Sequence, residues 1–172
     1  MTGRTRAAVG AALTLIGLFL TFLSFLPDVS VETYQSLNPS DPFATFYRVS
    51  NNWICSIKNV QPSCFALSAI GPRLNASDDL SQVISDTVPE LAHGGRTTAS
   101  CPFGGQLGGA EHAEILIRVV YRPWPFWTRT KAVCFRGMKN ASGDFVWLDE
   151  ACPANALSRV DSLLQDFKRF QP

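Results

Sequence analysis

The N-terminal 26 residues constrain the fold of this chain most strongly. Arg4 and Arg6 precede residues 7–26, a stretch that contains no charged side chain. About 20 residues at ~1.5 Å rise per residue span roughly 30 Å, the thickness of the hydrocarbon core of a bilayer. Residues 1–26 are therefore predicted to be a cytoplasmic N-terminus and a transmembrane signal anchor, because the positive-inside rule keeps the two arginines in the cytoplasm.

A cleaved secretory signal and a buried helix are the alternative interpretations of this segment. The apolar core of a cleaved signal is usually about 7–15 residues long and ends in small residues before the cleavage site. Here the apolar stretch is longer, and it ends in Phe25, Leu26 and Pro27 with no such site after it. The retained anchor is favoured, with the rest of the chain on the outer side of the membrane.

The charge composition argues against two kinds of interaction. The chain has 15 Lys and Arg residues against 14 Asp and Glu residues, with no long run of either sign. Nucleic-acid binding calls for a concentrated basic face, and a polybasic lipid-binding arm calls for a basic run. We therefore expect no nucleic-acid partner and no basic arm at the membrane.

The cysteines favour disulfides over a zinc or redox site. The sequence has five of them and no C-x-x-C pair, which argues against a zinc ribbon or a thioredoxin-like site. In an oxidising compartment up to two disulfides can form and one thiol is left over. The spacing leaves the pairing open among Cys55, Cys64, Cys101, Cys134 and Cys152.

Residues 27–152 are predicted to form one mainly β domain, a β-sandwich. Short segments rich in aromatic and β-branched residues alternate with turn signals, a pattern typical of antiparallel sandwiches. Strands are expected at residues 29–34, 43–50, 53–60, 64–70, 97–101, 111–122, 128–136 and 144–148.

Alternation and turn chemistry predict further local details. Trp53, Cys55 and Ile57 are expected to face the core, since they share one side of their strand. Pro62 is expected to break the strand run that surrounds it. A turn of helix is expected near residues 80–84.

The clearest elements are the strand at residues 111–122 and an amphipathic helix at residues 153–172. Every second residue from Ala113 to Tyr121 is apolar, which predicts a half-buried strand of an antiparallel sheet. The helix either packs against the sheet or docks on a partner or the membrane surface. Its apolar positions recur at three- and four-residue spacing: Leu157, Val160, Leu164 and Phe167.

Several spaced motifs give the chain a family resemblance. They are DPF at 41–43, FYRVSNN at 46–52, IKNV at 57–60, SC at 63–64, GRTT at 95–98, CPF at 101–103, YRPW at 121–124 and VWL at 146–148. In these motifs the chain resembles an uncharacterised family of small bacterial membrane-anchored proteins. The resemblance implies an immunoglobulin-like sandwich behind one N-terminal helix in the cytoplasmic membrane. It also implies a disulfide between Cys64 and Cys101, whereas Cys55, Cys134, Cys152 and the C-terminal helix are additional to the pattern.

The segment between the strands at 111–122 and 128–136 is the best binding candidate. It should form a hairpin tip, and its two prolines reduce the ordering entropy that binding would cost. Trp, Tyr and Arg are enriched at binding hot spots, and Trp and Tyr at bilayer interfaces. The alternative is a structural cap on the end of the core. The candidate residues are Tyr121, Arg122, Trp124, Phe126, Trp127 and Arg129.

No catalytic signature stands out in the sequence. His112 and Glu114 share one strand face and could join a metal site, although two ligands are weak grounds for one. The glycine-rich residues 104–109 lack the Lys-Ser/Thr of a P-loop and are read as a flexible connection.

The expected function is that of a non-enzymatic interaction module or an accessory subunit of a membrane complex. Residues 7–26 are expected to contact the membrane, and no cofactor, metal or catalytic residue is expected. Two alternatives stay open: a metal-dependent envelope hydrolase that uses His112 and Glu114, and a small-ligand binding protein.

Overall fold

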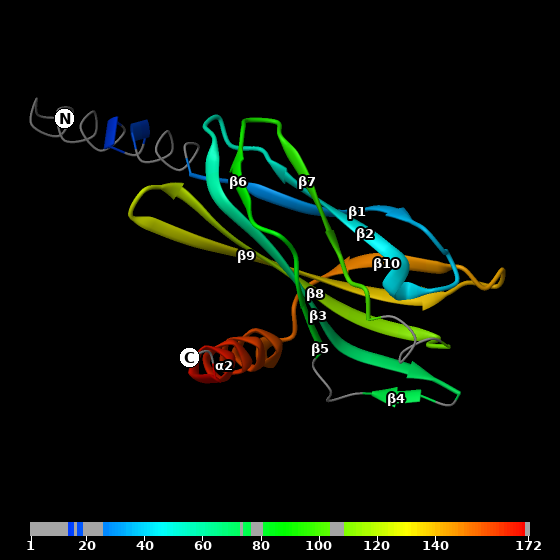
Figure 1. The fold of residues 1–172 in the computed structure, drawn as a ribbon. Coiled ribbons are helices and arrows are strands. Elements are labelled where there is room, and N and C mark those ends of the chain that lie inside the picture. The colour runs from blue at the N-terminus through cyan, green and yellow to red at the C-terminus, as the bar shows by residue number, and fades with distance from the viewer. Residues whose placement is uncertain are drawn as a thin grey trace, which may run out of the picture.

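The computed structural model describes residues 14–15, 17–18, 26–72, 74–76, 81–103 and 109–170 of the chain. Two antiparallel sheets account for most of it, which confirms the mainly β prediction and a sandwich-like arrangement (Figure 1). The three-stranded sheet has the order β1 (Val29–Ser36), β2 (Thr45–Asn51) and β7 (Arg96–Ser100).

The seven-stranded sheet is built around two long central strands, β3 and β8. Its main path runs β10-β9-β8-β3-β4, and β5 and β6 also pair with β3. The bounds are β3 (Ile57–Gly71), β4 (Leu74–Ala76), β5 (Ser81–Ile84), β6 (Val88–Leu91), β8 (His112–Trp124), β9 (Trp127–Lys139) and β10 (Phe145–Glu150). A short 3-10 helix, η1 (Pro42–Ala44), precedes β2, and α2 (Ala154–Phe170) ends the described chain.

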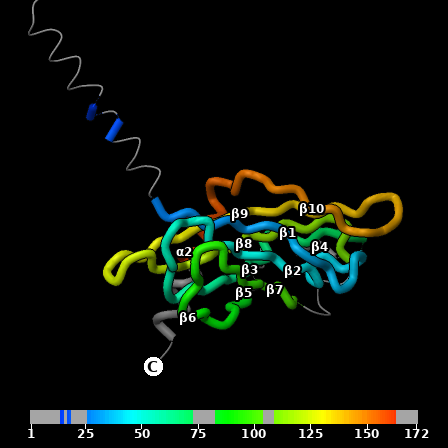
Figure 2. Tube along the Cα trace, turned by 90° about the horizontal axis from the view of Figure 1, so that it is seen from above, coloured from blue at the N-terminus to red at the C-terminus, as the bar shows by residue number. Residues whose placement is uncertain are grey.

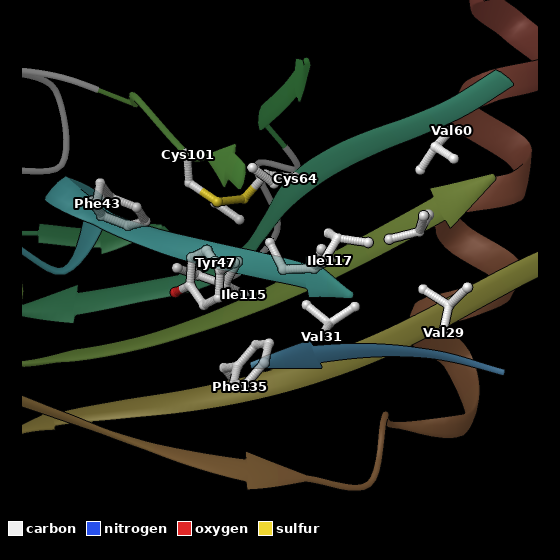
Figure 3. Packing of buried hydrophobic residues seen from close by; sticks show 14 of the residues in the cluster. Val29, Val31, Phe43, Tyr47, Val60, Cys64, Cys101, Ile115, Ile117 and Phe135 are labelled. Atoms are coloured by element: carbon white, nitrogen blue, oxygen red, sulfur yellow. A yellow bond between two sulfur atoms is a disulfide. The ribbon is translucent and has the colours of Figure 1, made fainter. Parts of the chain in front are cut away.

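The main core lies between the two sheets. The alternating apolar residues of β8 from Ala113 to Tyr121 are all buried there, as their period predicts. Tyr47 and Val49 face them from β2, and Phe135 joins them from β9 (Figure 3). Burial of this shared apolar face holds the two sheets together.

The helix α2 covers the outer face of the seven-stranded sheet. Ala156 and Val160, one helical turn apart, are buried against Phe65, Leu67 and Leu116 of β3 and β8. The expected packing of the helix against the sheet is therefore confirmed for the side chains that the structure describes. The side chains of Leu164 and Phe167 lie outside that described part.

Two disulfides join parts of the fold that are distant in sequence. Cys64 of β3 pairs with Cys101, which directly follows β7, so the expected bridge is confirmed and links the two sheets (Figure 3). The second, between Cys134 and Cys152, ties β9 to the segment before α2. All five cysteines are described, and the unpaired one is the exposed Cys55.

Disulfides form and persist in oxidising compartments, so the pair indicates an extracytoplasmic environment. No helix among the described residues is long and apolar enough to cross a bilayer. Most of residues 7–26, the predicted anchor, lies outside the residues that the structure describes.

Three local predictions were wrong. The strand expected from residue 53 begins only at Ile57, so Cys55 sits in a loop and is exposed, whereas Trp53 and Ile57 are buried as expected. Pro62 lies inside β3 and does not interrupt it. On one edge of β3, Pro62 falls between the residues that pair with β6 and those that pair with β5, which is where a residue without an amide hydrogen is tolerated.

The third wrong prediction is the turn of helix near residues 80–84. Ser81–Ile84 form the strand β5 on the edge of β3. Ladder hydrogen bonds to β3 thus override the weak local helical pattern, because a short isolated turn gains little from its own sequence.

Tyr47 places a polar hydroxyl group inside the core. Its ring is fully buried, and its hydroxyl has no hydrogen-bond partner among the described residues. Replacing Tyr47 with Phe should therefore raise the free energy of unfolding by about 1 kcal/mol, since it removes an unsatisfied buried polar group. Chemical denaturation at neutral pH measures this difference, and any loss of stability in the Tyr47→Phe protein would contradict the prediction.

The same substitution should change how the stability of the protein depends on pH in the alkaline range. Burial raises the pKa of the Tyr47 phenol above its usual value of about 10. The folded state then holds the proton more tightly than the unfolded state does, so this contribution to stability is complete below pH ~10 and is lost as pH rises further. Thermal midpoints should fall less steeply above this pH in the Tyr47→Phe protein than in the wild type.

Candidate functional site at the hairpin end

The candidate tip closes the β8–β9 hairpin at one end of the sandwich. Trp124 and Trp127 are partners across the strands, and Pro125 and Phe126 form the turn between them. The start of β1, the loop at residues 52–56 and the turn at residues 92–95 lie at this same end, and the β9–β10 turn lies at the opposite one (Figures 1 and 2). We call this region the hairpin end.

Stacked tryptophans hold the hairpin tip in place. The rings of Trp124 and Trp127 are parallel within 9° with centroids 5.1 Å apart. Trp124 also packs edge-on against the buried Trp53 at 5.0 Å, which attaches the tip to the core. The Arg129 guanidinium lies 4.4 Å from the centre of the Trp127 ring, on its face. The tip is therefore a supported structure, and Trp124 has the capping role that the alternative interpretation expected.

The outer residues of the tip face solvent. Phe126 is 94% exposed and Trp127 is 40% exposed, which is unusual for large aromatic side chains. Arg122 is also exposed. Of the candidate binding residues, these three are exposed, and Trp124 and Arg129 are partly exposed.

Tyr121, by contrast, supports the tip from inside. Its side chain is 3% exposed and belongs to the main core. Burial raises the pKa of its phenol; the positive charge of Arg129 lowers it and the negative charge of Asp28 raises it. Tyr121 is therefore a neutral packing residue at physiological pH, and its contact with a partner would be indirect.

Asn51 holds the loops of the hairpin end together. Its side-chain NH2 group donates hydrogen bonds to the carbonyls of Cys55 (2.8 Å), Leu91 (3.0 Å) and Ala92 (3.1 Å). Its side-chain oxygen accepts one from the Trp53 amide at 3.0 Å. Asn51 is fully buried, so these bonds satisfy side-chain polar atoms that water does not reach.

The role of Asn51 does not follow from the sequence. The residue stands out there only as part of the FYRVSNN motif, because the carbonyls that it binds at Leu91 and Ala92 are some 40 residues away. A polar residue that ends a strand pattern rich in apolar residues is the one available signal. Next to it, His93 Nδ1 lies 2.7 Å from the carbonyl oxygen of Trp53, which gives that histidine a structural role.

A pocket of about 520 Å³ opens beside the hairpin. It is lined by Trp53, Cys55, Ser56, Lys58, Asn59, Arg122, Pro123, Trp124 and Pro125. Two cations, two indole rings and the free thiol thus share one concave surface. Asn59 has a φ of 50°, a left-handed conformation that Asn tolerates better than most residues, and it sits where the β3–β8 register shifts.

Of the two residues of the alternative metal site, Glu114 is engaged in an ion pair. Arg136 pairs with Glu114 at 3.0 Å and also with Glu150 at 3.0 Å. His112 is exposed on the same strand. No group of three His, Cys, Asp or Glu side chains suited to a metal was found within the described ranges. Residues 104–108 of the glycine-rich connection lie outside those ranges.

The hairpin end is thus an aromatic and cationic surface on a rigid support. Its residues come from β3, β8, β9 and the loops at 52–56 and 92–95. No protein-family model, no curated protein and no solved structure matches the chain. The function is therefore inferred from the hairpin end itself.

Proposed function

We propose that this protein is a single-pass membrane-anchored envelope protein that acts as a non-enzymatic interaction module or an accessory subunit of a membrane complex. Residues 7–26 anchor the chain in the bacterial cytoplasmic membrane, with the N-terminus inside. The domain after them lies on the outer side, an assignment that the two disulfides support. An inter-sheet disulfide between two packed antiparallel sheets further supports an immunoglobulin-like sandwich.

The short connection to the anchor determines which end of the domain faces the membrane. Pro27 and Asp28 alone separate the proposed anchor from Val29, which is buried and begins β1. The Asp28 carbonyl accepts a hydrogen bond from the Asn52 amide at 3.0 Å, so the chain is already held there. Because an extended residue spans at most ~3.6 Å, the start of β1 lies within roughly 10 Å of the end of the proposed anchor, and the hairpin end is the end of the domain that faces the bilayer.

The observation that carries this proposal is the exposed aromatic tip on the membrane-facing end. Phe126 and Trp127 project from a tip that stacking and two prolines already order, so binding costs little further entropy. Trp and Arg side chains supply much of the energy at protein interfaces. A tip at the membrane-facing end of the domain can contact the outer, membrane-proximal surface of a neighbouring membrane protein.

The proposal is tested by purifying the tagged full-length protein from its native membrane in mild detergent. We expect one membrane protein to copurify in stoichiometric amount, and the double substitution Phe126→Ser and Trp127→Ala to lower its recovery at least about tenfold. The matched control is Met138→Ser, which removes a 42% exposed apolar side chain from the far end of β9.

The control should retain the partner in full. Quantitative mass spectrometry of the eluates gives the ratios, and circular dichroism checks that each variant is folded. The absence of any stoichiometric partner, or equal recovery with the tip variant and the wild type, would contradict the proposed contact surface.

A further inference from the structure

Lys58 and Arg122 place two like charges side by side in the pocket. They are direct partners across the β3–β8 ladder, so their side chains leave the same face of the sheet. Like charges in this position destabilise a sheet unless an anion compensates them. Neither side chain forms an ion pair with any carboxylate of the described residues.

The acidic neighbour of Lys58 on β6 forms no ion pair with either cation. Glu90 of β6 is the partner of Lys58 on the other edge of β3, and no ion pair joins the two. Glu90 is also absent from the pocket wall. Lys58 and Arg122 are therefore the charged residues of the pocket wall, and both are cations.

The rest of the pocket wall suits an amphipathic anion. Trp53 and Trp124 form an apolar and aromatic side next to the cations. Indole rings favour the headgroup level of a bilayer, where one part of the ring meets acyl chains and another meets water. A phosphate with a glycerol and acyl portion attached has this combination of charge and apolar surface.

We infer that this pocket binds the phosphate of an anionic phospholipid headgroup in the membrane that anchors the chain, an inference that rests on the anchoring proposed above. Lys58 and Arg122 contact the phosphate oxygens, and Trp124, packed on the buried Trp53, contacts the glycerol region. The lipid would set the tilt of the domain and thereby the direction in which the exposed tip points. The same phosphate chemistry occurs in free glycerol phosphate, which the experiment separates from the lipid.

Cys55 provides a built-in reporter for the test. It is exposed, it lines the pocket, and the other four cysteines are in disulfides, so a neutral maleimide should label this position alone. The full-length oxidised protein is reconstituted into vesicles of phosphatidylcholine, and into vesicles with equal parts of phosphatidylcholine and phosphatidylglycerol. We expect Cys55 to be alkylated at least about fivefold more slowly in the anionic vesicles, since each cation near an anionic surface contributes about that factor in affinity.

Variants that change individual charges inside and outside the pocket distinguish a specific site from the general surface potential. The double substitution Lys58→Gln and Arg122→Gln should abolish the protection of Cys55. Lys139→Gln, at the far end of β9, should retain it, and so should Glu90→Gln. A slowing that persists in the Lys58→Gln and Arg122→Gln protein would come from the surface potential and would overturn the inference.

Two further arms identify the source of the phosphate and separate the two proposals. Protection of the detergent-solubilised protein by free glycerol phosphate, without protection by anionic vesicles, would overturn the lipid assignment. Flotation of the chain with phosphatidylcholine vesicles tests the anchor independently of the pocket. Failure to float would overturn the anchoring, whereas flotation with equal labelling in both kinds of vesicle would overturn the pocket inference alone.

Discussion

Replacing Asn51 with aspartate should lower the free energy of unfolding by about 4 kcal/mol at neutral pH. The substitution is nearly isosteric, so packing is preserved while the hydrogen bonding is inverted. The Asn51 amide group donates to the carbonyls of Cys55, Leu91 and Ala92. A carboxylate in its place would face three acceptors and have no proton to give them, in a site with no access to water.

The pH dependence identifies this mechanism. Burial and the three carbonyls would raise the pKa of the new carboxyl group in the folded state above its value of about 3.9 in the unfolded state. The stability deficit of the variant should therefore be smallest near pH 4 and grow as pH rises. Denaturant titrations at several pH values measure it.

Asn52→Asp is the matched control for this prediction. It introduces the same charge one residue away, on an exposed side chain, and should change the free energy of unfolding by less than about 0.5 kcal/mol. Equal losses from the two substitutions would show that Asn51 does not hold the loops of the hairpin end. The Asn51→Asp protein should also lose the pocket shape, because Trp53 and Cys55 depend on this residue for their position.

Removing the inter-sheet disulfide should lower the free energy of unfolding by about as much as Asn51→Asp does. We expect the double substitution Cys64→Ala and Cys101→Ala to lower the free energy of unfolding by about 4 kcal/mol, because the bridge closes a loop with a sequence separation of 37. Both sulfur atoms belong to fully buried residues of the main core, so their loss also leaves a cavity. Denaturant unfolding of the purified proteins measures the difference.

The second disulfide should contribute less to the free energy of unfolding than the first. Cys134 and Cys152 have a sequence separation of 18, so their replacement by alanine should cost about 3 kcal/mol. Cys55→Ala should cost less than about 0.5 kcal/mol, since this side chain is exposed and unpaired. A larger loss from the Cys134 and Cys152 pair than from the Cys64 and Cys101 pair would contradict this order.

Local sequence patterns predicted the elements whose stability is local. The alternation in β8 predicts a buried face, and the turn residues after it predict a hairpin with β9. The three- and four-residue spacing of apolar residues from Leu157 to Phe167 likewise predicted α2. The burial of Leu116 on the other face of β8 was not visible, because it depends on where α2 packs.

The candidate site was predictable only in part. Its aromatic hairpin follows from adjacent residues, but the contribution of Tyr121 to the core, and not to the surface, depends on packing against distant strands. The strand expected at residues 53–56 rested on the two-residue spacing of Trp53, Cys55 and Ile57, which is typical of a strand. In the folded protein the side chain of Asn51 bonds to the Trp53 amide and the Cys55 carbonyl, and it holds these residues in a loop.

The sequence by itself determined the mainly β class, the C-terminal helix and the aromatic tip, because each depends on residues that are neighbours in the chain. Only the tertiary structure decided that Lys58 meets Arg122, that Asn51 reaches Leu91 and that Cys64 pairs with Cys101. These contacts join segments separated by about 40 residues or more, whose meeting depends on strand pairing and on burial of the shared core. Charges that are balanced and scattered along the sequence thereby become a local cationic pocket at one end of the fold.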